Sequence, residues 1–211
     1  MRILITAGPT REYIDAVRFI SNASSGRMGC VLAAAAAAAG HEVTLLLGRG
    51  AAATVAANAA GRVETVPFDS VAELASELSD RFPACDALLM AAAVGDFRPE
   101  TRAAGKLSRS GGPIELRLIP TEDVLAATTA SRRPGQVVVA FAVEQGSDEQ
   151  IETRALTKLA RKGADLIVLN TPEAMAAEAS RACVLSPRGA VLQWAERPKK
   201  ALAEAIVRLL G

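Results

Sequence analysis

The chain has 211 residues and an almost balanced charge, with 24 basic and 23 acidic side chains and a formal net charge of +1. This balance gives no general attraction to nucleic acid or to a membrane surface, so an anionic ligand must be held by local positive charge. Half of the residues are hydrophobic but only 3% are aromatic. We therefore expect one domain, residues 1–211, with a core of closely packed aliphatic side chains.

The sequence also bears on the compartment of the protein. No stretch approaches the ~20 apolar residues of a membrane span, and the first residues do not have the apolar core and cleavage site of a signal peptide. Cys30, Cys85 and Cys183 are far apart and lie in apolar contexts, which is typical of inert reduced thiols. We expect a cytoplasmic protein, and no motif predicts side chains that bind a metal.

Short apolar runs alternate with longer helical segments along the chain. Continuously apolar runs are typical of strands that are buried on both faces of a parallel sheet. The alternation predicts an α/β fold with a doubly wound, mostly parallel, Rossmann-like sheet. The expected strands are 2–7, 42–47, 62–66, 86–92, 137–143 and 165–169, and the expected helices are 26–39, 70–80, 121–130 and 149–162.

Three further segments do not follow this alternation. Residues 182–194 contain a Pro-Arg-Gly turn between two apolar runs and predict a β-hairpin, and the amphipathic residues 197–210 predict a C-terminal helix. Residues 97–113 are basic, rich in glycine and proline, and have no apolar period. They predict a long mobile loop, followed by a strand at 114–119, and loops of this length are usually functional.

Polar or glycine-rich segments follow the first, fourth and fifth predicted strands. They are residues 7–29, 92–99 and 140–146. With the common strand order 3-2-1-4-5, these strands end at the edge of the sheet where parallel α/β proteins bind ligands. We therefore expect the three segments to line one crevice.

The residues before the alanine-rich helix have the features of an anion site. Gly26 and Gly29 allow close approach of the backbone, and the first amides of the helix carry the positive end of its dipole. Asn22, Ser24 and Ser25 add neutral hydrogen-bond donors. The same stretch also fits an ordinary helix cap followed by tight packing, so both interpretations stay open at this point.

An NAD(P)-linked reductase is the first alternative for such a fold. The glycines after the first strand do not form GxGxxG, however, and the connection is about twenty residues long instead of a tight turn. Catalysis by a Ser/His or Cys/His pair is also disfavoured, because the only histidine, His41, lies at the opposite end of the sheet. Nucleotidyl or phosphoryl transfer fits better, since it needs mainly positioning and charge neutralisation.

Several charged residues suit such a transfer. Lys106 lies in the basic loop, while Lys158 and Lys162 are four residues apart and share one helical face. On spacing alone, a solvated basic face is the commoner explanation for this pair. Asp96 is a candidate ligand for a metal ion or a sugar hydroxyl, and a loop cap is its plainer interpretation.

Six ordered motifs together resemble phosphopantothenoylcysteine synthetase, the phosphopantothenate-cysteine ligase of coenzyme A biosynthesis. They are TAGPTREYID, RFISNASSGRMG, AAAVGDFRP, GKLS, AFAVE and TKLARKGADLIVLN, and the resemblance extends over most of the chain. It implies a homodimer with a Rossmann-like fold. In the bacterial type, CTP and Mg²⁺ activate the carboxylate of 4'-phosphopantothenate as an acyl cytidylate, with release of pyrophosphate. The amine of cysteine then displaces CMP.

The resemblance also implies roles for individual residues. Asn22 would hold the acyl cytidylate, and Lys106 would neutralise the triphosphate, which makes these two the candidate catalytic residues. Residues 122–125 would offer backbone contacts to the nucleotide. The candidate nucleotide-binding residues are Ser24, Ser25, Gly26, Ala92, Asp96, Glu122, Asp123, Val124, Leu125, Phe141, Lys158 and Lys162.

The chain departs from the family pattern in the basic loop. The family commonly has Lys-x-Lys-Lys where this chain has Lys106, Leu107, Ser108 and Arg109. This difference keeps a nucleotide-binding module without turnover as a second alternative, and ATP in place of CTP also stays open because base selection depends on backbone contacts. Many bacterial members also carry an N-terminal flavin-dependent decarboxylase. We expect either a free-standing ligase or the ligase part of such a fused enzyme.

Overall fold

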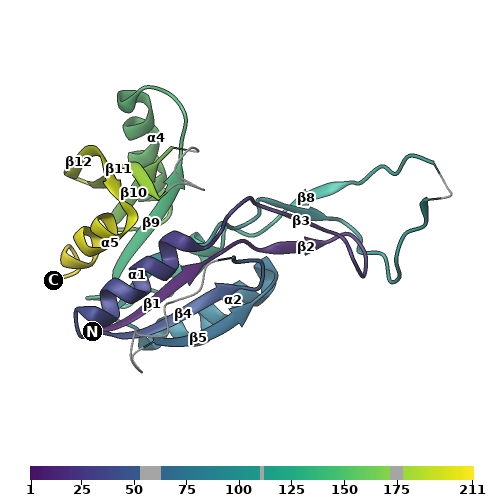
Figure 1. Cartoon of the computed structure of the whole chain (residues 1–211), viewed down its shortest axis with the longest axis horizontal. Coiled ribbons are helices and arrows are strands. Elements are labelled where there is room, and N and C mark those ends of the chain that lie inside the picture. The colour runs from purple at the N-terminus through teal and green to yellow at the C-terminus, as the bar shows by residue number, and fades with distance from the viewer. Residues whose placement is uncertain (53–62, 110–111, 172–177) are drawn as a thin grey trace.

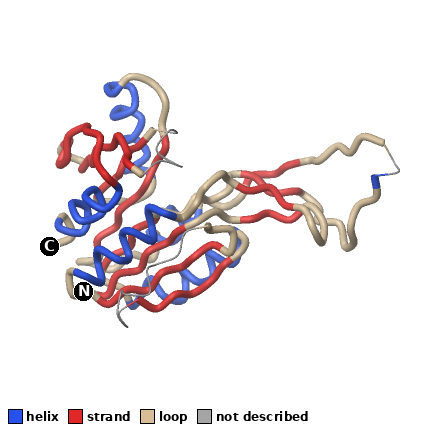
Figure 2. Tube along the Cα trace, in the orientation of Figure 1, coloured by secondary structure: helices blue, strands red, loops and turns tan. Residues whose placement is uncertain are grey.

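An eight-stranded sheet with helices on both faces forms the body of the protein, and a long arm extends from one side of it (Figure 1). The computed structural model describes residues 1–52, 63–109, 112–171 and 178–211, and the structural statements below concern these residues. Figure 2 shows that the arm also contains strands, which form two small ribbons separate from the main sheet.

The main sheet is parallel except at one edge. It consists of β1 (Arg2–Ala7), β4 (Glu42–Gly48), β5 (Val63–Phe68), β6 (Ala87–Met90), β9 (Val137–Val143), β10 (Leu166–Asn170), β11 (Ala179–Ser186) and β12 (Gly189–Pro198). The spatial order is β12-β11-β10-β9-β6-β1-β4-β5, and the only antiparallel pairings in it are those of β11 with β10 and with β12. Counted along the chain, the six parallel strands have the order 3-2-1-4-5-6, which confirms the predicted doubly wound, Rossmann-like sheet.

The expected strands of the sheet are all present; those at 2–7 and 137–143 have the predicted bounds, and the other four have shifted ends. The hairpin expected at 182–194 is longer, because β11 and β12 pair from Ala179 to Pro198. The strand expected at 86–92 is shorter than predicted. Arg62 and residues 110–111, which belong to an expected strand and to the expected loop, lie outside the described residues.

Helices cover the two faces of the sheet. They are α1 (Arg27–Ala38), α2 (Val71–Arg81), the short 3-10 helix η1 (Phe82–Ala84), α3 (Val124–Thr129), α4 (Asp148–Arg161) and α5 (Lys199–Arg208). Helices α1 and α5 pack on one face, and α2, α3 and α4 pack on the other. None of the helices in the described part of the chain has the length and apolarity needed for a membrane span.

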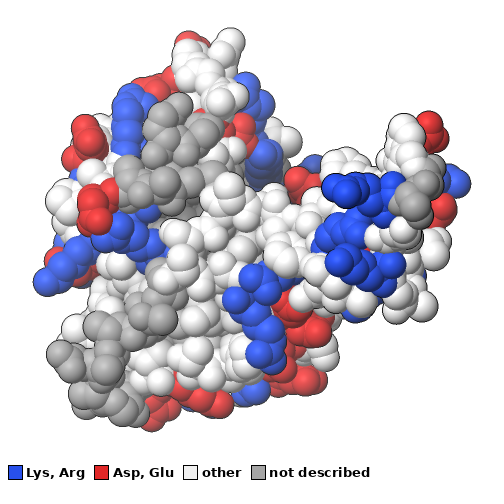
Figure 3. All heavy atoms as spheres, turned by 45° about the vertical axis from the view of Figure 1, so that its right-hand side comes forward, with Lys and Arg blue, Asp and Glu red and all other residues white. Residues whose placement is uncertain are grey.

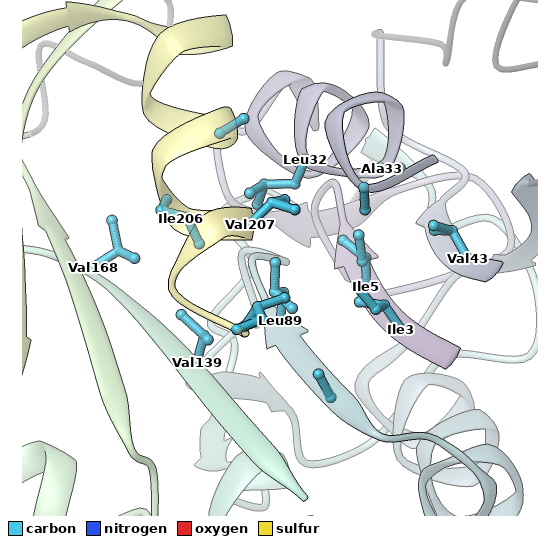
Figure 4. Packing of buried hydrophobic residues seen from close by; sticks show 14 of the residues in the cluster. Ile3, Ile5, Leu32, Ala33, Val43, Leu89, Val139, Val168, Ile206 and Val207 are labelled. Carbon is cyan, nitrogen blue, oxygen red and sulfur yellow. The ribbon is translucent and has the colours of Figure 1, made fainter. Parts of the chain in front are cut away.

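The central strands are almost entirely apolar because both of their faces are buried. In β1, Ile3 and Ile5 contact the cluster beneath α1 and α5, whereas Leu4 contacts the cluster beneath the opposite helices. All three side chains are at most 2% exposed. Figure 4 shows the first of these clusters, in which Leu32 of α1 and Ile206 of α5 meet the strands. Burial on both faces explains why these runs do not alternate with polar residues.

Helix α1 lies close against β1 because its facing residues are small. Ala33 is fully buried, and a Cβ atom at Gly29 would lie 2.4 Å from the Cβ atom of Ala7. Such a distance is too short for any side chain, so glycine is required there. Gly26, which precedes the helix, has a φ of 76° in the left-handed region. The tight-packing interpretation of these two glycines is therefore correct, and it does not conflict with an anion site at the helix start.

The arm was not predicted as a structure of its own. Strand β2 (Arg11–Tyr13) pairs with β3 (Phe19–Ser21), and β7 (Phe97–Pro99) pairs with β8 (Leu118–Pro120), both antiparallel. The first ribbon lies in the connection between β1 and α1, where we expected only a long turn. The expected loop at 97–113 is wrong at its start, because its first three residues form β7. Residues 100–109 and 112–113 of this loop run along the outer part of the arm (Figure 1).

Two predicted elements near the arm are shorter than expected. The strand expected at 114–119 is wrong for residues 114–117, which are exposed and outside any strand, because β7 offers only three residues to pair with. The helix expected at 121–130 begins at Val124. Asp123 caps it there, and its side chain accepts a hydrogen bond from the amide of Ala126 at 3.3 Å.

Candidate functional site

A cleft of about 640 Å³ opens at the carboxyl ends of β6, β9 and β10. It is lined by residues 22–28 at the start of α1, 90–94 at the end of β6 and 140–143 at the end of β9, so that segments far apart in the sequence meet. The start of α3 and the C-terminal end of α4 complete the wall. Among the residues selected from the sequence, the cleft brings together Asn22, Ser24, Ser25, Gly26, Ala92, Asp96, Glu122, Asp123, Val124, Leu125, Phe141, Lys158 and Lys162.

The side chain of Asn22 joins two of these segments. Its amide nitrogen donates hydrogen bonds to the carbonyl oxygens of Ala93 at 3.3 Å and Val94 at 3.0 Å. These bonds fix the segment before α1 against the segment that follows β6. The amide oxygen of Asn22 has no protein partner among the described residues. Asn22 thus presents a neutral polar group in the cleft, held in place by two backbone carbonyls.

The first turn of α1 is the most positive backbone element of the cleft. It contains no acidic residue, and its cap residue, Gly26, has no side chain. The hydroxyls of Ser24 and Ser25 instead accept hydrogen bonds from the amides of Gly26 and Arg27, at 3.3 and 3.4 Å. Because the first turn contains no carboxylate of its own, its free amides favour an anion in the cleft.

Both lysines of α4 face the cleft and are held by carboxylates from other elements. Lys158 forms an ion pair with Glu144, which follows β9 and is only 9% exposed. Lys162 forms an ion pair of 3.1 Å with Asp123 at the start of α3. The pairs hold the two ammonium groups at the cleft wall, and this arrangement differs from the solvated basic face that spacing alone favoured.

The carboxylate of Asp123 is stabilised in its charged form. Burial alone would raise the pKa of Asp123, but hydrogen bonds from Lys162 and the Ala126 amide, together with the charges of Lys162 and Arg161, outweigh burial and lower it. Asp123 therefore remains an anion at neutral pH. It serves both as the cap of α3 and as the partner of a cleft lysine.

Lys106 lies apart from the residues of the cleft. It lies on the arm, in a separate hollow of about 740 Å³ that is lined by Arg18 and Arg109 among others. Figure 3 shows that basic side chains gather on this part of the molecule. Within one chain, the structure does not bring the two candidate catalytic residues, Asn22 and Lys106, together.

Two residues that the motifs did not single out anchor the segment next to Lys106. Asp15 is fully buried and accepts hydrogen bonds from the amides of Val17 and Arg18, both at 2.7 Å, and of Leu107 at 3.1 Å. Arg18 forms an ion pair with Asp15 at 3.3 Å and donates to the carbonyl oxygen of Leu107 at 2.5 Å. An Asp side chain often accepts a hydrogen bond from the backbone two residues on in a turn, so Asp15 itself was the signal available in the sequence.

No cluster of three or more His, Cys, Asp or Glu side chains that suits a metal ion occurs within the described residues. The cleft nevertheless contains the exposed carboxylates of Asp96 and Glu122. Mg²⁺ is often held by one or two carboxylates together with the phosphates of a substrate. The donor set is therefore compatible with a metal ion that enters with a nucleotide.

Comparison with known proteins identifies relatives of this chain. It is 44% identical over 170 residues to a protein named cysteine/cysteine sulfinic acid decarboxylase from an unknown prokaryotic organism, a match that covers 81% of this chain and 45% of the relative. It is 42% identical over 176 residues to the coenzyme A biosynthesis bifunctional protein CoaBC of Mycobacterium bovis, covering 80% and 41%. The chain thus spans somewhat less than half the length of these two relatives.

A solved structure and a family model give the same assignment. The crystal structure of the C-terminal domain of a coenzyme A biosynthesis bifunctional protein CoaBC matches with a TM-score of 0.78 and 31% identity, covering 99% of this chain and 93% of that one. The model of the DNA/pantothenate metabolism flavoprotein C-terminal domain matches residues 1–211. The chain therefore belongs to the family of the DNA/pantothenate metabolism flavoprotein C-terminal domain.

Proposed function

We propose that the chain is the ligase that joins 4'-phosphopantothenate to L-cysteine in coenzyme A biosynthesis, through an acyl-nucleotide intermediate. The observation that carries this proposal is the single cleft that gathers Asn22, the start of α1, Phe141 and the two lysines of α4. Membership in a pantothenate-metabolism family, and relatives named for coenzyme A biosynthesis, support the same reaction.

The proposed reaction has two steps. A carboxylate oxygen of 4'-phosphopantothenate attacks the α-phosphorus of the nucleotide, a new P–O bond forms, and the bond to pyrophosphate breaks. The amine of cysteine then attacks the acyl carbon, the C–N bond forms with loss of a proton, and the nucleoside monophosphate leaves. No protein nucleophile is needed, which agrees with a cleft in which neutral donors and cations predominate.

The residues of the cleft have separate tasks in this scheme. The first step brings two anions together, and Lys158, Lys162 and the amides of α1 offset their repulsion. Asn22 holds the mixed anhydride through a neutral side chain that does not attack it. The ion pairs with Glu144 and Asp123 keep the lysines extended toward the cleft before the nucleotide binds.

We include Mg²⁺ in the proposal because it binds to the phosphates of the nucleotide. Asp96 and Glu122 are the residues that would hold the ion, together with phosphate oxygens. When bound, it would neutralise phosphate charge. CTP is the nucleotide we propose, with ATP as the alternative, and a cytoplasmic location remains a prediction.

A homodimer would explain how Lys106 takes part. Lys106 lies outside the cleft of its own chain, so neutralisation of the triphosphate requires either a large movement of the arm or the arm of a second copy. The arm carries exposed apolar side chains, with Val17 58%, Phe97 53% and Ile114 50% exposed. Apolar side chains gathered in this way are typical of surfaces that another chain covers. We therefore propose that two copies associate through their arms.

A pyrophosphate-release assay tests the function directly. The chain is mixed with 4'-phosphopantothenate and either CTP or ATP in the presence of Mg²⁺, with and without cysteine. We expect pyrophosphate to form in both cases with CTP, and 4'-phosphopantothenoylcysteine to form only when cysteine is present. CTP binding without pyrophosphate release would favour a nucleotide-binding module, and tight NADPH binding without release would favour a reductase.

A further inference from the structure

The cleft has a second polar wall, between α1, β11 and α5. Arg27, Ser180 and Lys199 line it, together with the apolar side chains of Met28 and Leu202. No motif in the sequence assigns a task to Ser180 or Lys199. Their surroundings show that both are built into the cleft wall.

The last two strands bring Ser180 and Lys199 together. Ser180 of β11 pairs with Arg197 of β12, and Lys199 begins α5 immediately after this strand. The amide of Lys199 donates a hydrogen bond to the carbonyl oxygen of Glu178 at 3.1 Å, which holds the start of α5 against β11. Because α5 packs beside α1 on the same face, this pair lies near the positive first turn of α1.

The hydroxyl of Ser180 is buried and has no hydrogen-bond partner among the described residues. The residue is only 2% exposed, and nothing in the described part of the chain replaces the water that its Oγ atom has lost. A buried hydroxyl without a hydrogen bond destabilises the fold, and such groups in native proteins usually have a specific reason. An acceptor from a ligand in the cleft would satisfy it.

The ammonium group of Lys199 is also buried without a counter-charge in contact. Lys199 is 5% exposed, and no carboxylate within the described residues forms an ion pair with it. Burial and the nearby charge of Arg27 lower the pKa of Lys199, and Glu178 only partly offsets them. Glu178 is itself paired with Arg27 at 2.5 Å. Lysine is rarely buried unless it is paired, so an anion is the partner that this environment fits.

We propose that Lys199 and Ser180 form a phosphate-binding subsite of the cleft. Phosphate oxygens would accept hydrogen bonds from the ammonium and hydroxyl groups and would face the first turn of α1. The identity of the ligand rests on the proposed function, in which both CTP and 4'-phosphopantothenate carry phosphate groups. The shared chemistry is a phosphate monoester or the terminal phosphates of a nucleotide.

Binding measurements with matched ligands test the proposal and identify the phosphate. The full chain is titrated in a calorimeter with CTP, CMP, pyrophosphate, 4'-phosphopantothenate and pantothenate, using the wild type and Lys199→Met. We expect Lys199→Met to lose about tenfold or more in affinity for the ligand whose phosphate occupies the subsite. A loss for CTP and pyrophosphate but not CMP assigns the terminal phosphates, and a loss for 4'-phosphopantothenate but not pantothenate assigns the phosphate of the acid.

Two further variants separate ligand binding from folding. Lys200→Met removes the same charge from the neighbouring, exposed residue outside the cleft, and it should leave every affinity unchanged. Ser180→Ala should leave the thermal stability of the free protein unchanged or higher, because it removes a buried unpaired hydroxyl. The same variant should weaken binding of the assigned phosphate about fivefold. A purely structural serine would show the opposite, lower stability with normal affinity.

The outcomes also separate this subsite from the proposed ligase. Pyrophosphate binding that depends on Lys199, in a protein that makes no product, would keep the subsite and reject the ligase. Full product formation with unchanged affinities in Lys199→Met and Ser180→Ala would keep the ligase and overturn the subsite. If Lys199→Met does not fold, Ser180→Ala decides the question by itself.

Discussion

Apolar side chains are buried in the body of the protein but exposed on its arm. In the body, Leu4 and Leu88 lie on central strands and are at most 1% exposed, because helices cover both faces of the sheet. On the arm, Leu116 is 42% and Ile114 50% exposed, although both lie in an alternating apolar pattern. In the body, the apolar side chains are buried by other parts of the same chain. On the arm, the apolar side chains named here remain exposed in a single chain.

Lys106 of the arm also differs from two lysines at the cleft, Lys158 and Lys162. In the cleft, Lys158 and Lys162 form ion pairs with carboxylates of their own chain. On the arm, Lys106 has no ion-pair partner within the described part of the chain. The two lysines at the cleft are therefore held in place by their own chain before a ligand binds, whereas Lys106 is not.

The largest expected effect concerns Lys106. Lys106→Gln should lower pyrophosphate release by about a hundred- to thousandfold, because it removes a cation that offsets charge in the transition state. Lys106→Arg, which keeps the charge, should recover part of the rate. Circular dichroism should show an unchanged fold, since Lys106 lies outside both core clusters.

Mixing two inactive variants shows which chain Lys106 serves. Asn22→Asp adds a negative charge to the cleft and should also prevent turnover. If arms are exchanged, a mixed dimer of Lys106→Gln and Asn22→Asp has one intact site, and activity should return to about a quarter of the wild-type value. No recovery after dissociation and reassociation would show that Lys106 acts on the cleft of its own chain.

The next effect compares two leucines, one from each region. Leu88→Ala should lower the free energy of unfolding by about 2–5 kcal/mol, because it leaves a cavity in the core. Leu116→Ala should change it by no more than about 0.5 kcal/mol at high dilution, while weakening self-association in analytical ultracentrifugation. Urea unfolding of both variants checks the contrast, and equal destabilisation would mean that the arm packs as part of the core.

The smallest expected effect is a dependence on pH in the turn between β2 and β3. Hydrogen bonds from the amides of Val17 and Arg18 lower the pKa of Asp15 below its ordinary value of 3.8, although burial opposes them. Because the folded pKa is the lower one, Asp15 contributes stability above pH 3.8 and loses it as the pH falls through the folded pKa.

Nuclear magnetic resonance can follow this titration at the Leu107 amide, which donates to Asp15. We expect its resonance to stay constant from pH 7 to 3.8 and to shift only below that value. Asp15→Asn should shift it already at pH 7, whereas Asp80→Asn, a change of the same type at an exposed residue of α2, should not. A midpoint above pH 3.8 would contradict the lowered pKa.

The sequence predicted the body well because local patterns and tertiary packing agree there. Apolar runs such as residues 2–7 and 137–143 became strands of a parallel sheet, and the alanine-rich segment became α1. Since strand order follows common rules, the segments after those strands could be placed in one crevice. The residues of the cleft could therefore be predicted from the apolar pattern of the sequence together with its resemblance to a known family.

The arm could not be predicted because its structure depends on contacts between distant residues and not on a local pattern of apolar residues. The three-residue strands β2 and β3 are too short for a periodic signal, and residues 114–117 have a strand pattern without a strand to pair with. The tasks of Asp15 and Arg18 depend on contact with Leu107, which is about ninety positions away in the sequence. Ser180 and Lys199 were missed for a similar reason, because only the pairing of β11 with β12 makes them neighbours.

Gly29 influences ligand binding because it has no Cβ atom where α1 contacts β1. Since any substituent at this residue would collide with Ala7, a larger residue would force the helix outward and carry the amides of its first turn with it. The position of an anion bound at the start of α1 thus depends on Gly29, which faces β1 and would not contact the ligand. Selection on ligand geometry should consequently act on Gly29 as strongly as on residues that line the cleft.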